Sequence, residues 1–250
     1  MVSAAELQNY CDRLLATEEF DDFCPNGLQV AGERPIAHLI SGVTASLALI
    51  KAAMDREADA ILVHHGWFWK GESPRLVGIK GRRVRTILQS GMSLLAYHLP
   101  LDAHPEIGNN RCLGERLGFQ TMEVTRAGAG LLWKGVLPKP LEGRALAHHI
   151  GSRLGRDPLH IAVREEPIAS IAWCTGAAQH WIEEAAALGV QAYLSGEISE
   201  QTVHQARELG LDYFAAGHHA TERYGVQRLG DRIADAFGIQ HSFLDLDNPA

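Results

Sequence analysis

Three apolar segments of the sequence end in residues of the types that bind metal ions. Each segment is followed by a histidine, and two of them also by a carboxylate four residues after that histidine. The residues are His64, His65, His98, Asp102, His218 and Glu222. Imidazole suits zinc, iron, copper and nickel, and carboxylate oxygens also hold manganese and magnesium. These residue types therefore indicate a metal site.

The spacing of the candidate ligands favours two ions over one. Adjacent residues on a strand point to opposite faces, so His64 and His65 share a site only where the strand ends and the backbone turns. A carboxylate has two oxygens, so Asp102 or Glu222 could bridge two ions. Three imidazoles and two carboxylates do not saturate two metals, which leaves positions for water or substrate.

Each motif taken alone also has a structural interpretation. The His64–His65 pair could bind backbone carbonyls at a strand end, and His218–Glu222 could be a helix N-terminus with an acidic first turn. The segment His98–Asp102 could be a turn, helped by Pro100 and Pro105. Their recurrence in a duplicated frame favours the metal interpretation.

An internal duplication positions these residues. Each copy is predicted to run strand, helix, strand, helix, strand. The strands are expected at 36–44, 58–66 and 92–98, then at 168–175, 190–197 and 211–218, and the helices at 46–57, 82–90, 179–188 and 200–209. Thr44 matches Thr175 and His64 matches Ser195 with the same difference in residue number. His98 matches His218 with a smaller difference, because the loop before the last strand is shorter in the second copy.

Alternating strands and helices predict an α/β fold: two interlocked lobes built from a duplicated βαβ unit, with mostly parallel sheets flanked by helices. A strand at 131–138, a helix at 141–154 and a strand at 159–164 lie between the copies, and the glycine-rich segment 125–130 is the predicted hinge. The lobes are expected at 1–124, with His64, His65 and Asp102, and at 125–250, with His218 and Glu222. Function in such sheets sits at the carboxyl ends of strands, which predicts a metal site in the cleft between the lobes.

Composition narrows the class of protein. The sequence has 30 Asp and Glu residues and 23 Lys and Arg residues. This net negative charge disfavours binding to the phosphates of nucleic acid through overall electrostatic attraction. The four cysteines are scattered without Cys-x-x-Cys spacing, which disfavours a disulfide framework and fits a reducing compartment. Neither a secretory signal nor a membrane-spanning apolar stretch is visible, so a cytoplasmic protein is expected.

At this point the motifs resemble a known family. The blocks Val63–Gly66, Ala96–Asp102 and Gly217–Glu222, with Asn26–Val30 and Ser195–Glu197, are similar to those of the Nif3-like dinuclear metal centre family, also called GTP cyclohydrolase I type 2 homologues. The similarity covers essentially the whole chain. One difference is that the family often has Thr after the histidine that matches His98, where this chain has Leu99.

The resemblance implies a site, a cofactor and an assembly. His64, His65, Asp102, His218 and Glu222 would bind two divalent ions (Fe, Zn, Mn, Ni or Co), with Glu222 as the bridge. It further implies a toroidal homohexamer whose sites face an inner cavity.

Two bridged ions lower the pKa of a bound water toward ~7, which suggests a metal-dependent hydrolase. His98 is the candidate for an outer-shell residue or proton shuttle beside Asp102. Trp67, Phe68 and Trp69 could stack a planar substrate or could pack between lobes or subunits. The family name points to a nucleotide-like or phosphorylated small molecule as substrate.

A second hypothesis belongs to a different class: a non-catalytic, metal-stabilised oligomeric scaffold or regulator that binds protein partners. A third is metal storage or trafficking, which predicts facile release of the ions. Substitution of Glu222 by Gln separates the first two, because only an enzyme loses an activity while its assembly stays intact.

Overall fold

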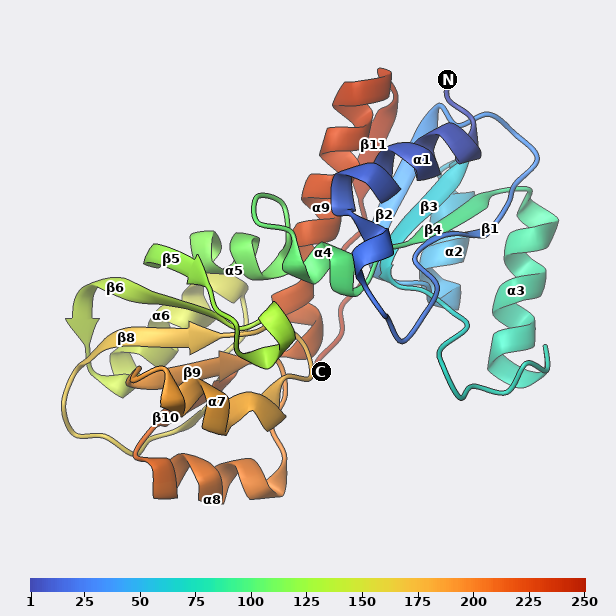
Figure 1. Ribbon diagram of the computed structural model, residues 1–250. Helices are drawn as coiled ribbons and strands as arrows, with labels where there is room; N and C mark the ends of the chain where they lie inside the picture. Colours follow the sequence, from blue (N-terminus) through green and yellow to red (C-terminus); the bar gives the residue numbers. More distant parts are fainter. The chain divides into compact units, whose positions relative to one another are not determined.

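The computed structural model describes all 250 residues and divides the chain into two compact units. The first unit comprises Met1–His104 and Gly225–Asp247, and the second comprises Pro105–Tyr224 and Asn248–Ala250. These bounds differ from the predicted lobes 1–124 and 125–250, because residues 105–124 pack in the second unit and residues 225–247 return to the first. Each unit contains one sheet flanked by helices, which confirms the α/β class (Figure 1).

The sheet of the first unit has the strand order β1-β4-β3-β2-β11. All its neighbours are parallel except β1, which pairs antiparallel with β4. The strands are β1 (Gly27–Val30), β2 (His38–Thr44), β3 (Ala60–His65), β4 (Ser93–Ala96) and β11 (Gln240–Phe243). The helices are α1 (Ala4–Leu15), η1 (Thr17–Glu19), α2 (Leu47–Met54), α3 (Gly78–Ser90), α4 (Leu99–Ala103) and the second half of α9 (His218–Phe237).

Burial of apolar runs explains the central strands of this sheet. In β3, residues 60–64 are all buried, and every residue of β4 is buried. A strand that is covered on both faces has a continuous run of apolar residues, so the sequence alone predicts these two strands. In Figure 1, α2 and α3 lie on one face of the sheet, and α1 and the end of α9 lie on the other.

The second unit has the strand order β5-β6-β8-β9-β10-β7. Its strands are β5 (Gln120–Val124), β6 (Trp133–Leu141), β7 (Leu159–Ile161), β8 (Ile168–Trp173), β9 (Ala192–Ser195) and β10 (Asp212–Ala215). Its helices are α5 (Asn109–Leu117), η2 (Gly128–Gly130), α6 (Gly143–Leu154), η3 (Gln179–Trp181), α7 (Ile182–Ala187), α8 (Glu200–Leu209) and the start of α9. In Figure 1, α7 and α8 cover one face of this sheet, and α5 and α6 cover the other.

The duplication is present in three dimensions. The series β2-α2-β3-α3-β4 and β8-α7-β9-α8-β10 each form three neighbouring parallel strands. Ile40 pairs with Ile61, and their counterparts Ile171 and Ala192 pair in the second copy. The third strands differ in register. In the first copy, Leu94 lies opposite Ile61. In the second copy, the residue opposite Ala192 is Asp212, which comes two residues before the counterpart of Leu94. His98 and His218 therefore both follow the third strand, but at different distances from its paired residues.

Two expectations about the second unit need correction. The segment 125–130 is not a hinge between the units, because it connects β5 with its antiparallel partner β6 inside the second unit. The second sheet is mixed, because β5, β6 and β7 add antiparallel pairings around the parallel strands β8, β9 and β10. None of the helices combines the length and the apolar composition needed to cross a membrane.

Candidate metal centre

The first unit gathers three histidines and an aspartate at the carboxyl ends of β3 and β4. The strands are parallel neighbours, with Val63 opposite Ala96, so the residues that follow them meet at one edge of the sheet. Ring nitrogens of His64, His65 and His98 lie within 4.8 Å of one another. His64 Nε2 is 3.5 Å from Asp102 Oδ1, which α4 carries one turn after His98. These four predicted residues therefore lie together in the first unit.

Hydrogen bonds orient the two adjacent imidazoles. His64 is buried, and its Nδ1 lies 2.9 Å from the carbonyl oxygen of Tyr97. A carbonyl only accepts, so Nδ1 carries the proton and Nε2 is the nitrogen with a lone pair for a metal. His65 Nδ1 lies 3.2 Å from Thr44 Oγ1, a hydroxyl that can donate or accept, so this contact engages Nδ1 and leaves Nε2 outside the pair.

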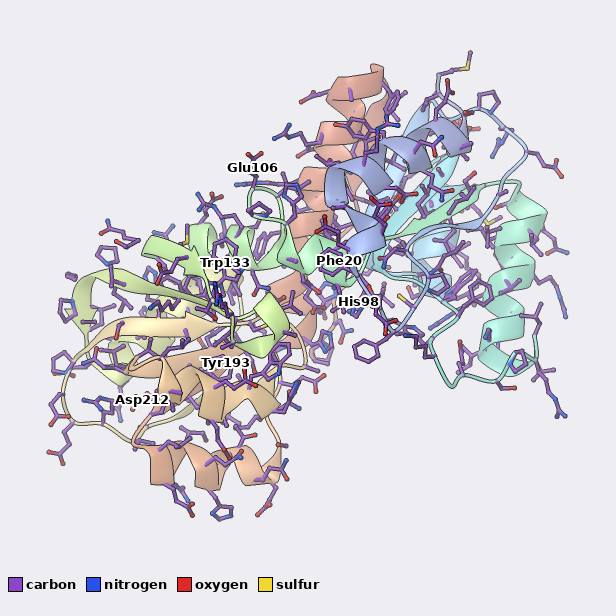
Figure 2. The ribbon with its side chains drawn as sticks, in the orientation of Figure 1. Phe20, His98, Glu106, Trp133, Tyr193 and Asp212 are labelled. Carbon is purple, nitrogen blue, oxygen red and sulfur yellow. The ribbon has the colours of Figure 1, made fainter.

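A buried carboxylate holds His98, which is labelled in Figure 2. His98 Nδ1 is 2.7 Å from Asp22 Oδ1, and Asp22 Oδ2 accepts hydrogen bonds from the Leu99 N–H and the Asn26 amide. Burial alone would raise the pKa of Asp22, but the hydrogen bond and charge of His98, with the other two donors, lower it to about 2. Sequence reasoning missed Asp22; its one signal was the neighbouring Asn26–Val30 block.

Cys24 forms a further cluster with Asp22 and His98. Asp22 Oδ1 also accepts from the Phe23 N–H at 2.6 Å, so both of its oxygens are engaged with protein donors. Burial raises the pKa of the Cys24 thiol to about 12, and the nearby Asp22 charge adds to this rise. This cluster is therefore a structural anchor for His98, and the four cysteines form no disulfide.

In the second unit, His218 and Glu222 lie one turn apart at the start of α9. His218 Nε2 lies 3.0 Å from Glu222 Oε2, and His218 Nδ1 lies 2.7 Å from Glu197 Oε1. Burial disfavours the charged ring, but Glu222 and then Glu197 raise the pKa of His218 to about 9. Glu197 belongs to a block noted in the sequence, but no role followed from the sequence alone.

Gly176 leaves space for this pair of candidate ligands. A Cβ at Gly176 would collide with Glu222 Oε1 and would lie 3.2 Å from His218 Nε2. The φ of Gly176 is +67°, a conformation that favours glycine. The donor set in both units is imidazole nitrogen and carboxylate oxygen, which fits divalent Zn, Fe, Mn, Co or Ni.

Replacement of Gly176 by Ala tests this space. The variant should lose about 1–3 kcal/mol of stability from the left-handed backbone. Its Zn²⁺ affinity should also fall, about 10- to 100-fold, because the new methyl group displaces the Glu222 carboxylate. Gly189→Ala is the matched control, since Gly189 has a φ of +73° and a Cβ at that position would meet nothing within 4 Å. Equal Zn²⁺ affinity in the two variants would show that the methyl group does not reach the ligands.

The three aromatic residues after His65 have different environments. Trp67 is buried and donates its Nε1–H to the Ala45 carbonyl, so it belongs to the core. Phe68 is 37% exposed, with Lys80 Nζ 5.1 Å from its ring centre. The Trp69 ring centre lies 5.0 Å from that of His98 and 6.1 Å from that of His65. Of the three, only Trp69 borders the histidine cluster.

Comparisons with known proteins agree over the whole chain. Residues 2–249 match the model of the family described as Duf34/NIF3 (NGG1p interacting factor 3). A relative from Allochromatium vinosum is 59% identical over 100% of this chain and 98% of its own, and one from Pseudomonas aeruginosa is 51% identical over 100% and 99%. Both are named GTP cyclohydrolase 1 type 2 homolog. A solved structure of protein ybgI, described as of unknown function, has a TM-score of 0.95, 44% identity and full coverage of both chains.

Proposed function

The chain belongs to the Duf34/NIF3 family, and on that premise we propose that it binds two divalent metal ions and hydrolyses a nucleotide-like or phosphorylated small molecule. His64, His65 and Asp102 from the first unit and His218 and Glu222 from the second are the proposed ligands. Glu222 is the proposed bridge between the ions.

One observation carries this proposal. One histidine in each unit, His64 at the carboxyl end of β3 and His218 after β10, has Nδ1 held by a hydrogen bond and a carboxylate beside Nε2. This is the arrangement in which protein groups orient an imidazole for metal binding. The first set offers three ligands and the second set two, which leaves open positions at the ions for water or substrate.

The residues around the ligands have separate tasks in the proposed reaction. Bound cations would supply polarisation of the scissile group and of the attacking water. His98 has Nδ1 held by Asp22, so its Nε2 is the atom at which a proton can be taken up or released. Trp69 provides a flat apolar surface beside His65 and His98 for a planar substrate.

Elemental analysis of the purified protein tests the proposal first. We expect two divalent ions per chain, and a screen with GTP, other nucleotides and phosphoesters should then detect hydrolysis that a chelator removes and added metal restores. The name of the relatives places GTP first in that screen. Protein that takes up no ion after incubation with Zn²⁺ or Mn²⁺ would contradict the proposal. We further propose a homohexamer, which light scattering would detect as about six chain masses.

A further inference from the structure

Buried hydroxyl groups fix the turn Ser195–Glu197 at the carboxyl end of β9. The carbonyl oxygen of Glu197 lies 2.5 Å from the Tyr213 hydroxyl and 2.9 Å from Ser195 Oγ, and the two hydroxyl oxygens are 2.5 Å apart. Both Tyr213 and Ser195 are fully buried. A buried carbonyl with such donors is held firmly, because no water competes for it.

The number of protons limits how this triangle can be arranged. Two hydroxyl protons serve three contacts, so at least one of the hydroxyls donates to the carbonyl and the other donates either to the same carbonyl or to its neighbour. Burial raises the pKa of Tyr213, so its hydroxyl keeps its proton. The carbonyl of Glu197 therefore accepts a buried hydrogen bond in every arrangement.

The same turn is packed against the backbone of His218. The Gly196 N–H donates to the Gly176 carbonyl at 2.8 Å, and the Gly217 N–H donates to the Gly196 carbonyl at 2.9 Å. A Cβ at Gly196 would lie 2.7 Å from the Cα of His218. Any movement of the turn would therefore be transmitted to the start of α9.

The carboxylate of Glu197 depends on this anchor. Its side chain is 42% exposed, yet Oε1 lies 2.7 Å from His218 Nδ1. A partly exposed ion pair gains little free energy by itself, since ordering both side chains costs entropy. A fixed backbone at Glu197 lowers that cost, because fewer torsions remain to be restricted.

We propose that Tyr213 and Ser195 are positioning residues of the metal centre. They fix the carbonyl of Glu197, whose carboxylate holds His218 Nδ1 so that Nε2 is presented to the metal beside Glu222. The inference rests on the proposed function, because it requires His218 to be a ligand.

Titration of the purified protein with Zn²⁺ against a chromophoric chelator tests this role. Tyr213→Phe and Ser195→Ala should each weaken Zn²⁺ binding about 10-fold, the lower end of the effect of outer partners of metal ligands. Tyr193→Phe is the matched control. Its hydroxyl donates to the Ala178 carbonyl at 2.7 Å, and Tyr193 is equally buried on the neighbouring strand β9 (Figure 2). It should change Zn²⁺ affinity less than ~2-fold.

A double-substitution cycle separates positioning from general destabilisation. If Tyr213 acts through Glu197, then Tyr213→Phe should weaken Zn²⁺ binding no further in a Glu197→Gln background. Equal weakening in both backgrounds, or weakening by Tyr193→Phe to the same degree, would overturn the inference. Wild-type protein that binds no Zn²⁺ would overturn the proposed function with it. Zn²⁺ binding that is lost in His218→Ala but unchanged in Tyr213→Phe would overturn this inference alone.

Discussion

Replacement of Glu222 by Gln is expected to reduce the bound metal from two ions per chain to one or fewer and to lower hydrolysis at least ~100-fold. The amide is neutral and offers one oxygen, so it cannot bridge two cations. The amide has the size of the carboxylate and can still accept a hydrogen bond from His218. The substitution should therefore leave the protein folded, although Glu222 is buried. Elemental analysis measures the bound metal, initial rates measure hydrolysis, and light scattering measures the assembly.

Glu200→Gln is the control for this substitution. Glu200 and His204 form another histidine–carboxylate pair one helical turn apart, at 3.0 Å, but the Glu200 side chain is 86% exposed. That variant should keep both ions and full activity. Retention of two ions and of activity in Glu222→Gln would contradict the bridge. Loss of the assembly, with no hydrolytic activity found in the wild type, would favour the non-catalytic scaffold.

The elements that carry the site were predictable because their signals are local. The strands β2, β3, β4, β8, β9 and β10 are short, mostly buried runs, and each helix predicted within the two copies lies between two of them. The change from apolar to metal-binding residues marks the strand end. In the first unit, adjacency of the parallel strands β3 and β4 brings the three histidines together, and in the second unit the four-residue spacing on α9 places Glu222 beside His218.

Other features have no local signal. The strand β11 pairs with β2, although His241 and Leu39 lie far apart in the chain, and β5 is largely exposed. The return of residues 225–247 to the first unit shifted the bounds of the units for the same reason. Asp22 and Glu197 also escaped prediction, because a carboxylate that supports a histidine is identified by its contact and not by its spacing. Such partners come from turns of irregular backbone, where side-chain direction follows from tertiary packing.

Substitution of Asp22 is expected to be among the single substitutions that lower the stability of the fold most. The two oxygens of Asp22 accept from the backbone N–H groups of Phe23 and Leu99, from the Asn26 amide and from His98. In Asp22→Asn one oxygen becomes an NH₂ group that faces other donors, so at least two hydrogen bonds are lost in a buried place. The loss should be about 2–4 kcal/mol at pH 7, since unsatisfied buried donors cost about 1–3 kcal/mol each. Chemical denaturation of the metal-free proteins measures it.

The pH dependence of this difference identifies its cause. The pKa of Asp22 is about 2 in the folded protein, below its value of ~3.9 in unfolded chains. The stabilisation by the ionised carboxylate is thus complete above about pH 4 and is lost as the pH falls toward 2, so the gap between wild type and Asp22→Asn should narrow over that interval. Asp21→Asn is the control, because Asp21 pairs with Lys70 but is 95% exposed, and its effect should be small at every pH. A gap that stays constant from pH 7 to pH 2 would instead show that the ionised form of the carboxylate is not the source of the cost, because Asn has nearly the same shape as Asp.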